Sequence, residues 1–292
     1  MSKPFGAQDM VSSLARVIVK SPSPSMAAAD SQQWHYGTGL TQAALDAQHA
    51  EFVSVLSESG AEVIQLNGAS DDLCDAIFPH DPSLVCDAGA IILRMGKELR
   101  RPEPDAHKHT YDEIGIPVIG TIESPGTVEG GDCVWLNGDT LIVGRGFRTN
   151  QSGIDQLKSI LEPRGVSVLV YDLPVLSGEA ACLHLMSIIS ILDHDLALIY
   201  KPLMPVAFYQ MLQDKGVVLV EGDVDEFERS NGLNLNVLAT RPRDCIAVAG
   251  FPKTVAAMRA AGCQVQTFNG DDLCIKCEGG PTCLTRPVLR RQ

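Results

Sequence analysis

One cysteine of this sequence lies in a setting typical of a reactive thiol. Cys283 ends the segment 277–283, CEGGPTC, whose two glycines and proline predict an irregular turn. A thiol beside such a turn can be approached closely by a ligand, and its thiolate is a strong nucleophile near neutral pH. The competing interpretation is a buried structural cysteine, which is expected for most of the nine cysteines.

A cysteine nucleophile needs an acid/base partner, and His184 is the candidate for that role. It lies between two leucines at the start of an apolar stretch, where a histidine is more often part of the core. A zinc site on Cys274, Cys277 and Cys283 is a third interpretation, but no Cys or His follows Cys283 to supply a fourth ligand. Residues 273–277 also alternate like a strand, which would point the sulfurs of Cys274 and Cys277 to opposite faces.

Several charged residues have positions suited to binding a charged ligand. Glu129 precedes a glycine pair in the segment 128–132, VEGGD, and Asp75 and Asp81 flank an apolar centre. Carboxylates at these positions could bind a cation through charge-assisted hydrogen bonds. Arg148 follows the strand-like run 140–143, and an arginine at a strand end could bind a carboxylate in the same way. Taken singly, each group is equally typical of a solvated turn.

These residues are far apart in the chain, so the fold must bring them together. Five helix-like stretches each end at a glycine that is followed by a short β-branched run, and roughly 50 residues separate successive copies. The pattern predicts a helix ended by a left-handed glycine that leads into a strand. Five copies favour an α/β propeller of five units around one central site, with a doubly wound sheet as the alternative. The glycines are Gly60, Gly115, Gly165, Gly216 and Gly262.

The segment from about residue 21 to 39 has a different composition. It contains the run SPSP, several alanines and an aromatic cluster at residues 34–36. Its prolines disfavour a helix, so we expect a surface loop between the first strand and the first helix. A long loop with aromatic side chains could be a lid over a site, although a plain surface loop is an equally good interpretation.

Taken together, these motifs resemble the dimethylarginine dimethylaminohydrolase family of the pentein superfamily, which also contains arginine deiminases and amidinotransferases. The resemblance runs from VIVKSP at 17–22, through EGGD at 129–132, RTN at 148–150 and HL at 184–185, to GGPTC at 279–283. It implies one catalytic domain over residues 1–292 with the family's α/β fold, a five-bladed propeller of ββαβ units. One departure is His80, which stands where the family usually has an acidic residue.

The resemblance also implies an activity. It is the hydrolysis of free arginine-type guanidines, above all of N-omega-methylated arginine to citrulline and an alkylamine, through a covalent cysteine thiouronium and without a metal or organic cofactor. The implied roles are nucleophile for Cys283, general acid/base for His184, guanidinium binding for Glu129 and Asp81, further substrate binding for Asp75, and α-carboxylate binding for Arg100 and Arg148.

Other functions remain open at this stage. An arginine deiminase, an arginine dihydrolase or an amidinotransferase would use the same residues, because the motifs do not encode the leaving group. A guanidine-binding protein without activity is a further alternative, but a binder has no need of a nucleophile. The zinc-binding protein considered above is another.

Composition and charge restrict the class of partner. The chain has 292 residues, of which 45% are hydrophobic, and its formal net charge is −13. This charge disfavours nucleic acid and anionic membranes as partners and mildly favours cationic small molecules. The resemblance implies that the partner is a small cationic guanidino amino acid. We expect a cytoplasmic protein with reduced cysteines, because no secretory signal pattern and no apolar run of about 20 residues is present. A homodimer is possible.

Overall fold

The protein is an α/β structure built from five separate three-stranded sheets. The computed structural model describes residues 3–176, 178–179 and 183–291. Four sheets contain consecutive strands of the chain, and the fifth combines strands from its two ends. The four are β3 (Ser83–Cys86), β4 (Gly89–Ile92) and β5 (Val118–Thr121); β6 (Cys133–Asn137), β7 (Thr140–Arg145) and β8 (Ser167–Asp172); β9 (Ile189–Asp193), β10 (Leu196–Ile199) and β11 (Val218–Glu221); and β12 (Leu238–Arg241), β13 (Asp244–Val248) and β14 (Gln264–Phe268).

Each of these four sheets has the same ββαβ order. The first two strands form an antiparallel hairpin, a helix follows, and the third strand returns parallel to the second. A parallel return needs a crossover, and a helix provides it while covering the sheet. The crossover helices are α4 (Glu103–Glu113), α5 (Gln151–Leu161), α6 (Val206–Asp214) and α8 (Pro252–Ala260), with the short α7 (Val224–Ser230) preceding the fourth sheet.

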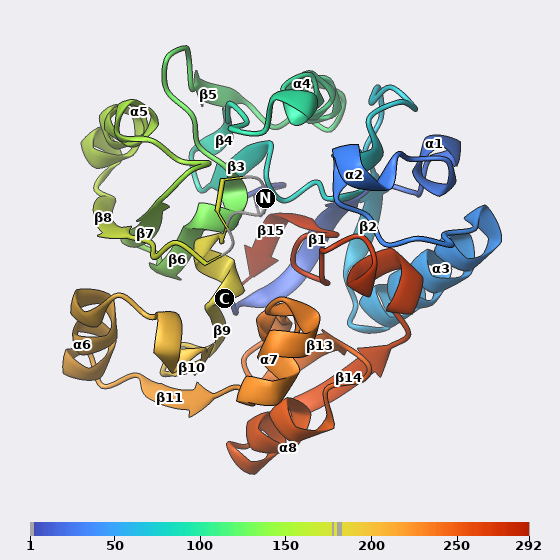
Figure 1. Cartoon of the computed structure of the whole chain (residues 1–292). Coiled ribbons are helices and arrows are strands. Elements are labelled where there is room, and N and C mark those ends of the chain that lie inside the picture. Colours follow the sequence, from blue (N-terminus) through green and yellow to red (C-terminus); the bar gives the residue numbers. More distant parts are fainter. Residues whose placement is uncertain (1–2, 177, 180–182, 292) are drawn as a thin grey trace.

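The fifth sheet joins the two ends of the described chain. Its first strand is β15 (Arg286–Arg291), which pairs antiparallel with β1 (Ser13–Val19), and β1 pairs parallel with β2 (Glu62–Gln65) after the helix α3 (Gln42–Glu58). The ββαβ order is therefore kept although the chain ends fall inside the unit. Figure 1 shows the five sheets around a common middle, with the five crossover helices at the periphery. The single continuous sheet that the sequence also left open is not what the described residues form.

The predicted junctions from helix to strand are confirmed at all five positions. Each of the five repeat glycines lies between a crossover helix and the third strand of its unit, and their φ angles range from 73° to 94°. A side chain at this φ costs energy because its Cβ approaches the following carbonyl, which is why glycine stands there.

The core lies between the sheets and the helices that cover them. The middle strands β4, β7 and β10 are almost wholly buried, and they consist mostly of apolar residues without alternation. The helices present one apolar face to this core, as Leu45, Phe52 and Leu56 of α3 do. In the described parts of the chain, no helix has the length and apolar character that crossing a membrane requires.

The segment 21–39 departs from the expected loop. It lies between β1 and α3 as predicted, but it forms two short helices, α1 (Pro24–Ala27) and α2 (Ser31–Trp34). The prediction that proline would prevent a helix was wrong, because Pro24 occupies the first position of α1, where its missing N–H is no loss. Asp30 caps α2 by accepting hydrogen bonds from the backbone N–H groups of Gln32 and Gln33.

Candidate active site

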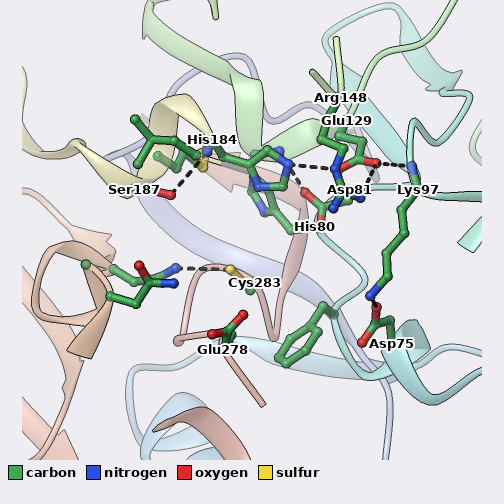
Figure 2. Close-up of a pocket in the computed structure, with 18 of the residues that line it drawn as sticks. Asp75, His80, Asp81, Lys97, Glu129, Arg148, His184, Ser187, Glu278 and Cys283 are labelled. Carbon is green, nitrogen blue, oxygen red and sulfur yellow. Dashed lines mark hydrogen bonds and ion pairs between the residues drawn. The ribbon is translucent and has the colours of Figure 1, made fainter. Parts of the chain in front are cut away.

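One pocket is lined by all seven residues that were predicted to form the active site. Figure 2 shows Cys283 and His184 facing each other in this pocket, with Asp75 and Lys97 at one side of it. Side chains that are scattered over more than 200 residues of sequence therefore share one hollow. The seven predicted residues that line it are Asp75, Asp81, Arg100, Glu129, Arg148, His184 and Cys283.

The five units contribute to the pocket in the same way. A polar or nucleophilic residue that lines the pocket stands shortly before the first strand of each unit. All five residues line the same pocket, so the segments that lead into the first strands converge there. The residues are Asp81 before β3, Glu129 before β6, His184 before β9, Asn236 before β12 and Cys283 before β15.

His184 is oriented by a buried carboxylate. Its Nε2 lies 2.7 Å from Oε2 of Glu129, whose other oxygen accepts hydrogen bonds from the backbone N–H groups of Gly96 and Lys97. Burial by itself would raise the pKa of Glu129, but the hydrogen bond from His184 and the positive charges of His184 and Arg148 together hold the pKa below its usual value. A charged carboxylate so placed stabilises a protonated His184, which suits a histidine that exchanges protons.

Asp81 is also fully engaged and charged. Its Oδ2 accepts from Nη1 of Arg100 at 2.7 Å, and its Oδ1 accepts from the backbone N–H of Gly131 at 2.8 Å. Burial opposes ionisation of Asp81, but the positive charges of Arg100 and His184 hold its pKa well below the usual range. The pocket lining therefore includes two carboxylates, Asp81 and Glu129, each of which has a cationic partner.

The Cys283 thiol is held in this field by one side-chain hydrogen bond. Nδ2 of Asn236 donates to its Sγ at 3.0 Å. Burial, and then the charge of Asp81, raise the pKa of Cys283, whereas Asn236 and the backbone of Gly280 lower it in part. The thiol therefore ionises less readily than a free cysteine.

The two glycine pairs of the site are required by close packing. A Cβ atom at Gly131 would lie 2.7 Å from Nδ1 of His184, and one at Gly130 would lie 2.1 Å from the carbonyl oxygen of His80. A Cβ at Gly279 would lie 2.2 Å from the ring of Phe78. Each distance is shorter than real Cβ contacts allow, so these glycines let the catalytic candidates pack against the backbone.

Arg100 does not have the expected geometry for binding a substrate carboxylate. Its guanidinium already donates to Glu103 through Nε and Nη2, to Asp81 through Nη1, and to the carbonyl oxygens of Asp75 and Phe78 through Nη2. Only 6% of its side chain is exposed. The prediction of direct carboxylate binding is therefore corrected for Arg100, which instead holds Asp81 in place.

The outer end of the pocket contains a cation that sequence reasoning missed. Nζ of Lys97 lies 2.6 Å from Oδ2 of Asp75 and 5.3 Å from the centre of the Trp34 ring. Oδ1 of the same aspartate accepts from the hydroxyl of Tyr36 at 2.8 Å. The expected lid segment thus reaches the site through its aromatic residues, and Trp34 lines the pocket. Lys97 follows Gly96 and belongs to no motif that the sequence analysis identified, so only the packing reveals its position in the site.

Arg148 lies beside Lys97 at this outer end. Its Nη1 is 3.7 Å from Oε1 of Glu129, and 14% of its side chain is exposed. A second, more open hollow next to the pocket shares Arg148, Lys97 and His35 with it. Two cations, Lys97 and Arg148, therefore line both the pocket and the more open hollow beside it.

The cysteines before the nucleophile differ from the expectation. Residues Asp271–Ile275 form a helical turn, so the predicted strand was wrong. The turn is stabilised from outside, because Oε1 of Gln48 on α3 accepts from the N–H groups of Asp272 and Leu273. Cys277 instead bonds through Sγ to the carbonyl oxygen of Asp272. Among the described side chains, no three His, Cys, Asp or Glu residues are grouped as a metal site would need.

This chain is similar in sequence to enzymes that act on arginine and its derivatives. Residues 69–217 match the family model described as arginine deiminase. A dimethylarginine dimethylaminohydrolase of Streptomyces coelicolor is 33% identical over 193 residues, which cover 64% of this chain and 69% of that protein.

Solved structures extend the similarity over nearly the whole chain. A dimethylarginine dimethylaminohydrolase of Pseudomonas aeruginosa, a Cys-to-Ser variant complexed with citrulline, superimposes with a TM-score of 0.77 at 25% identity, covering 96% of this chain and all of that one. An amidinotransferase of Microseira wollei from the saxitoxin pathway shares the fold, with a TM-score of 0.81 at 17% identity and coverage of 99% and 98%.

Proposed function

This chain belongs to the arginine deiminase family, and dimethylarginine dimethylaminohydrolases are among its relatives. We propose that it hydrolyses free N-omega-methylated arginine. The chain is a hydrolase that acts on the C–N bonds of linear amidines. The products of the proposed reaction are citrulline and an alkylamine.

The observation that carries this proposal is the pairing of His184 with Glu129 beside a cysteine. Nε2 of His184 lies 2.7 Å from the buried carboxylate of Glu129, and the Cys283 thiol lines the same pocket. The site therefore contains a nucleophile in Cys283, a base in His184 and a carboxylate in Glu129 that orients the base. Asp81 adds a second carboxylate whose oxygens can accept hydrogen bonds from a planar guanidinium.

In the first step the substrate itself helps to form the nucleophile. The positive charge of the bound guanidinium offsets the charge of Asp81, which lowers the pKa of Cys283 from its raised value. The thiol proton passes to His184, and the thiolate attacks the guanidinium carbon to form a tetrahedral adduct. His184 then protonates the departing amine, the C–N bond breaks, and a thiouronium remains on the sulfur.

In the second step water removes the thiouronium. His184, now neutral, accepts a proton from water as the oxygen attacks the same carbon. Collapse of this second adduct breaks the C–S bond, releases citrulline and restores the Cys283 thiol. No atom or electron pair has to come from a metal or an organic cofactor.

The α-amino and α-carboxylate groups of the substrate are proposed to bind at the open side of the pocket, near Lys97 and Arg148. We propose that Arg148 binds the α-carboxylate and that Asp75 binds the α-amino group. Support comes from the position of Arg148 and Lys97 at the pocket's open side. Arg100 has a different part in this proposal, because it holds Asp81 through their 2.7 Å ion pair.

Further proposals concern the whole chain. We propose that residues 1–292 are one catalytic domain and that the five ββαβ units form a five-bladed propeller, which the pairing of β1 with β15 supports. A cytoplasmic location and a homodimer stay predictions from the sequence.

A substrate panel tests the proposed function. Dimethylarginine, monomethylarginine, arginine and agmatine are incubated with the wild type, Cys283→Ser and His184→Ala, and citrulline, ornithine, ammonia and alkylamine are quantified. We expect citrulline and alkylamine from the methylated arginines, no turnover by Cys283→Ser, and an adduct on Cys283 in His184→Ala by mass spectrometry. Faster release of ammonia from arginine would indicate a deiminase, ornithine from arginine a dihydrolase or a transferase, and turnover by Cys283→Ser would exclude the thiouronium route.

A further inference from the structure

The fourth unit places an asparagine where the other units place catalytic candidates. Asn236 stands directly before the strand pair that opens with β12, in the position that Asp81, Glu129, His184 and Cys283 occupy in their own units. The proposed mechanism assigns a role to each of those four residues but none to Asn236. Its side chain is nevertheless buried and lines the same pocket.

The Asn236 amide is fixed in a single orientation. Its Oδ1 accepts a hydrogen bond from the backbone N–H of Thr282 at 2.9 Å, which leaves Nδ2 to donate to Sγ of Cys283 at 3.0 Å. Since a backbone N–H can only donate, the amide cannot be flipped without losing that bond. The hydroxyl of Thr282 also donates to the carbonyl oxygen of Val237 at 3.1 Å. The nucleophile turn is thus docked on residues 236–237.

Gly280 allows the turn that carries Cys283 to pack closely against Asn236. A Cβ atom at Gly280 would lie 2.6 Å from Cγ of Asn236, which is closer than real Cβ atoms approach. The backbone of the turn therefore rests against the flat face of the amide, and only glycine permits that distance. Gly280, the second glycine of CEGGPTC, therefore leaves room for the Asn236 side chain beside the cysteine.

The charge environment of Cys283 makes a donor valuable. The titratable groups that act on the thiol from the surrounding elements are Asp81, His184 and the buried Cys274, and Glu278 lines the same pocket from the turn itself. Asp81 opposes formation of the thiolate, and His184 exchanges protons during the reaction. Asn236 is an uncharged donor whose own charge does not change during the reaction, and its hydrogen bond is stronger to a thiolate than to a thiol.

We propose that Asn236 is a positioning residue for the nucleophile, which aims Sγ of Cys283 into the pocket and stabilises its thiolate through a charge-assisted hydrogen bond. This inference rests on the proposed role of Cys283 as nucleophile. The assignment also explains why all five units contribute a side chain to the site.

The test measures the pH dependence of Cys283 alkylation by iodoacetamide, followed at the Cys283 peptide by mass spectrometry. Asn236→Asp keeps the shape and the acceptor for Thr282 but loses the donor, and Asn236→Ala loses the donor without adding charge. A hydrogen bond to a charged group corresponds to about one to two pH units, so we expect the alkylation midpoint to rise by about that amount in both variants. Alkylation at neutral pH should fall about 10- to 100-fold, with the larger effect in Asn236→Asp.

Asn234→Ala is the matched control. Asn234 is as buried as Asn236 and lies two residues away, but its amide donates to Thr254 and to the carbonyl oxygen of Asp223. This variant should lose stability in urea without moving the alkylation midpoint.

Two results would overturn the inference. One is an unchanged midpoint in Asn236→Asp and Asn236→Ala, and the other is an equal rise in Asn234→Ala. Alkylation needs no guanidine substrate, so these results are independent of the proposed function, whose failure would show as turnover by Cys283→Ser.

Discussion

Replacing Gly131 with alanine would put a methyl group against the ring of His184. The new Cβ would lie 2.7 Å from Nδ1 and 2.9 Å from Cγ of that ring, and 3.1 Å from Oδ1 of Asp81. The φ angle of Gly131 is outside the left-handed region, so alanine adds no backbone strain. The substitution therefore acts on the position of His184 and on little else.

The size of the effect follows from these distances. The ring must withdraw by about 0.7 Å to restore an ordinary van der Waals contact with the methyl group. It can do so because 22% of the His184 side chain is exposed towards the pocket. This movement lengthens the 2.7 Å contact with Glu129 and takes Nε2 away from the reacting atoms. A displacement of about 1 Å can cost about 100-fold in rate, so we expect kcat to fall by about that factor.

The assay is citrulline formation at saturating dimethylarginine, with urea unfolding measured in parallel. Overpacking of this kind costs about 1–3 kcal/mol of stability, so the variant should remain folded under assay conditions. Gly138→Ala is the control in the same unit, because a Cβ there meets nothing within 4 Å. It should keep both the activity and the stability of the wild type.

A Gly131→Ala enzyme whose kcat stays within a few fold of the wild type would refute the reasoning. It would mean that His184 tolerates displacement from Glu129, and so that their contact does not orient a catalytic group. An equal loss in Gly138→Ala would show that the effect came from the fold of the unit rather than from the ring contact.

Three further predictions concern the charged residues. Burial and then the charge of Asp81 raise the pKa of Cys283, so Asp81→Asn should move the alkylation midpoint of that thiol to lower pH; an unchanged or higher midpoint would contradict this. Arg148→Ala should reduce kcat/KM for arginine derivatives by about 10- to 150-fold and hardly change that for agmatine, and equal losses for both substrates would count against a carboxylate contact. Arg100→Ala leaves the buried Asp81 and Glu103 without their cation, so urea unfolding should show a loss of about 3–5 kcal/mol, and wild-type stability would disprove that role.

Local sequence was sufficient to predict the repeated unit. A helix that ends at a left-handed glycine depends on a few neighbouring residues, so the junctions at Gly60, Gly115, Gly165, Gly216 and Gly262 could be identified without any tertiary contact. The chemistry of the site was visible for a related reason. A cysteine, a histidine and carboxylates beside glycine pairs are residue types with few alternatives for this reaction.

The tertiary structure decided how those side chains are used. Arg100 could be taken for a substrate ligand until Asp81 and Glu103 were seen to occupy its guanidinium. Lys97 carries no sequence signal, because its partner Asp75 comes from a different turn.

Asn236 is the clearest case of a role that only the fold could assign. It stands 47 residues before the thiol that it contacts, in a segment without glycine pairs or neighbouring charges. Residue type and spacing report on local backbone, whereas the direction of a hydrogen bond depends on where distant segments pack. The sequence by itself therefore determined the unit and the kinds of group in the site, and the convergence of five units determined which group acts on which.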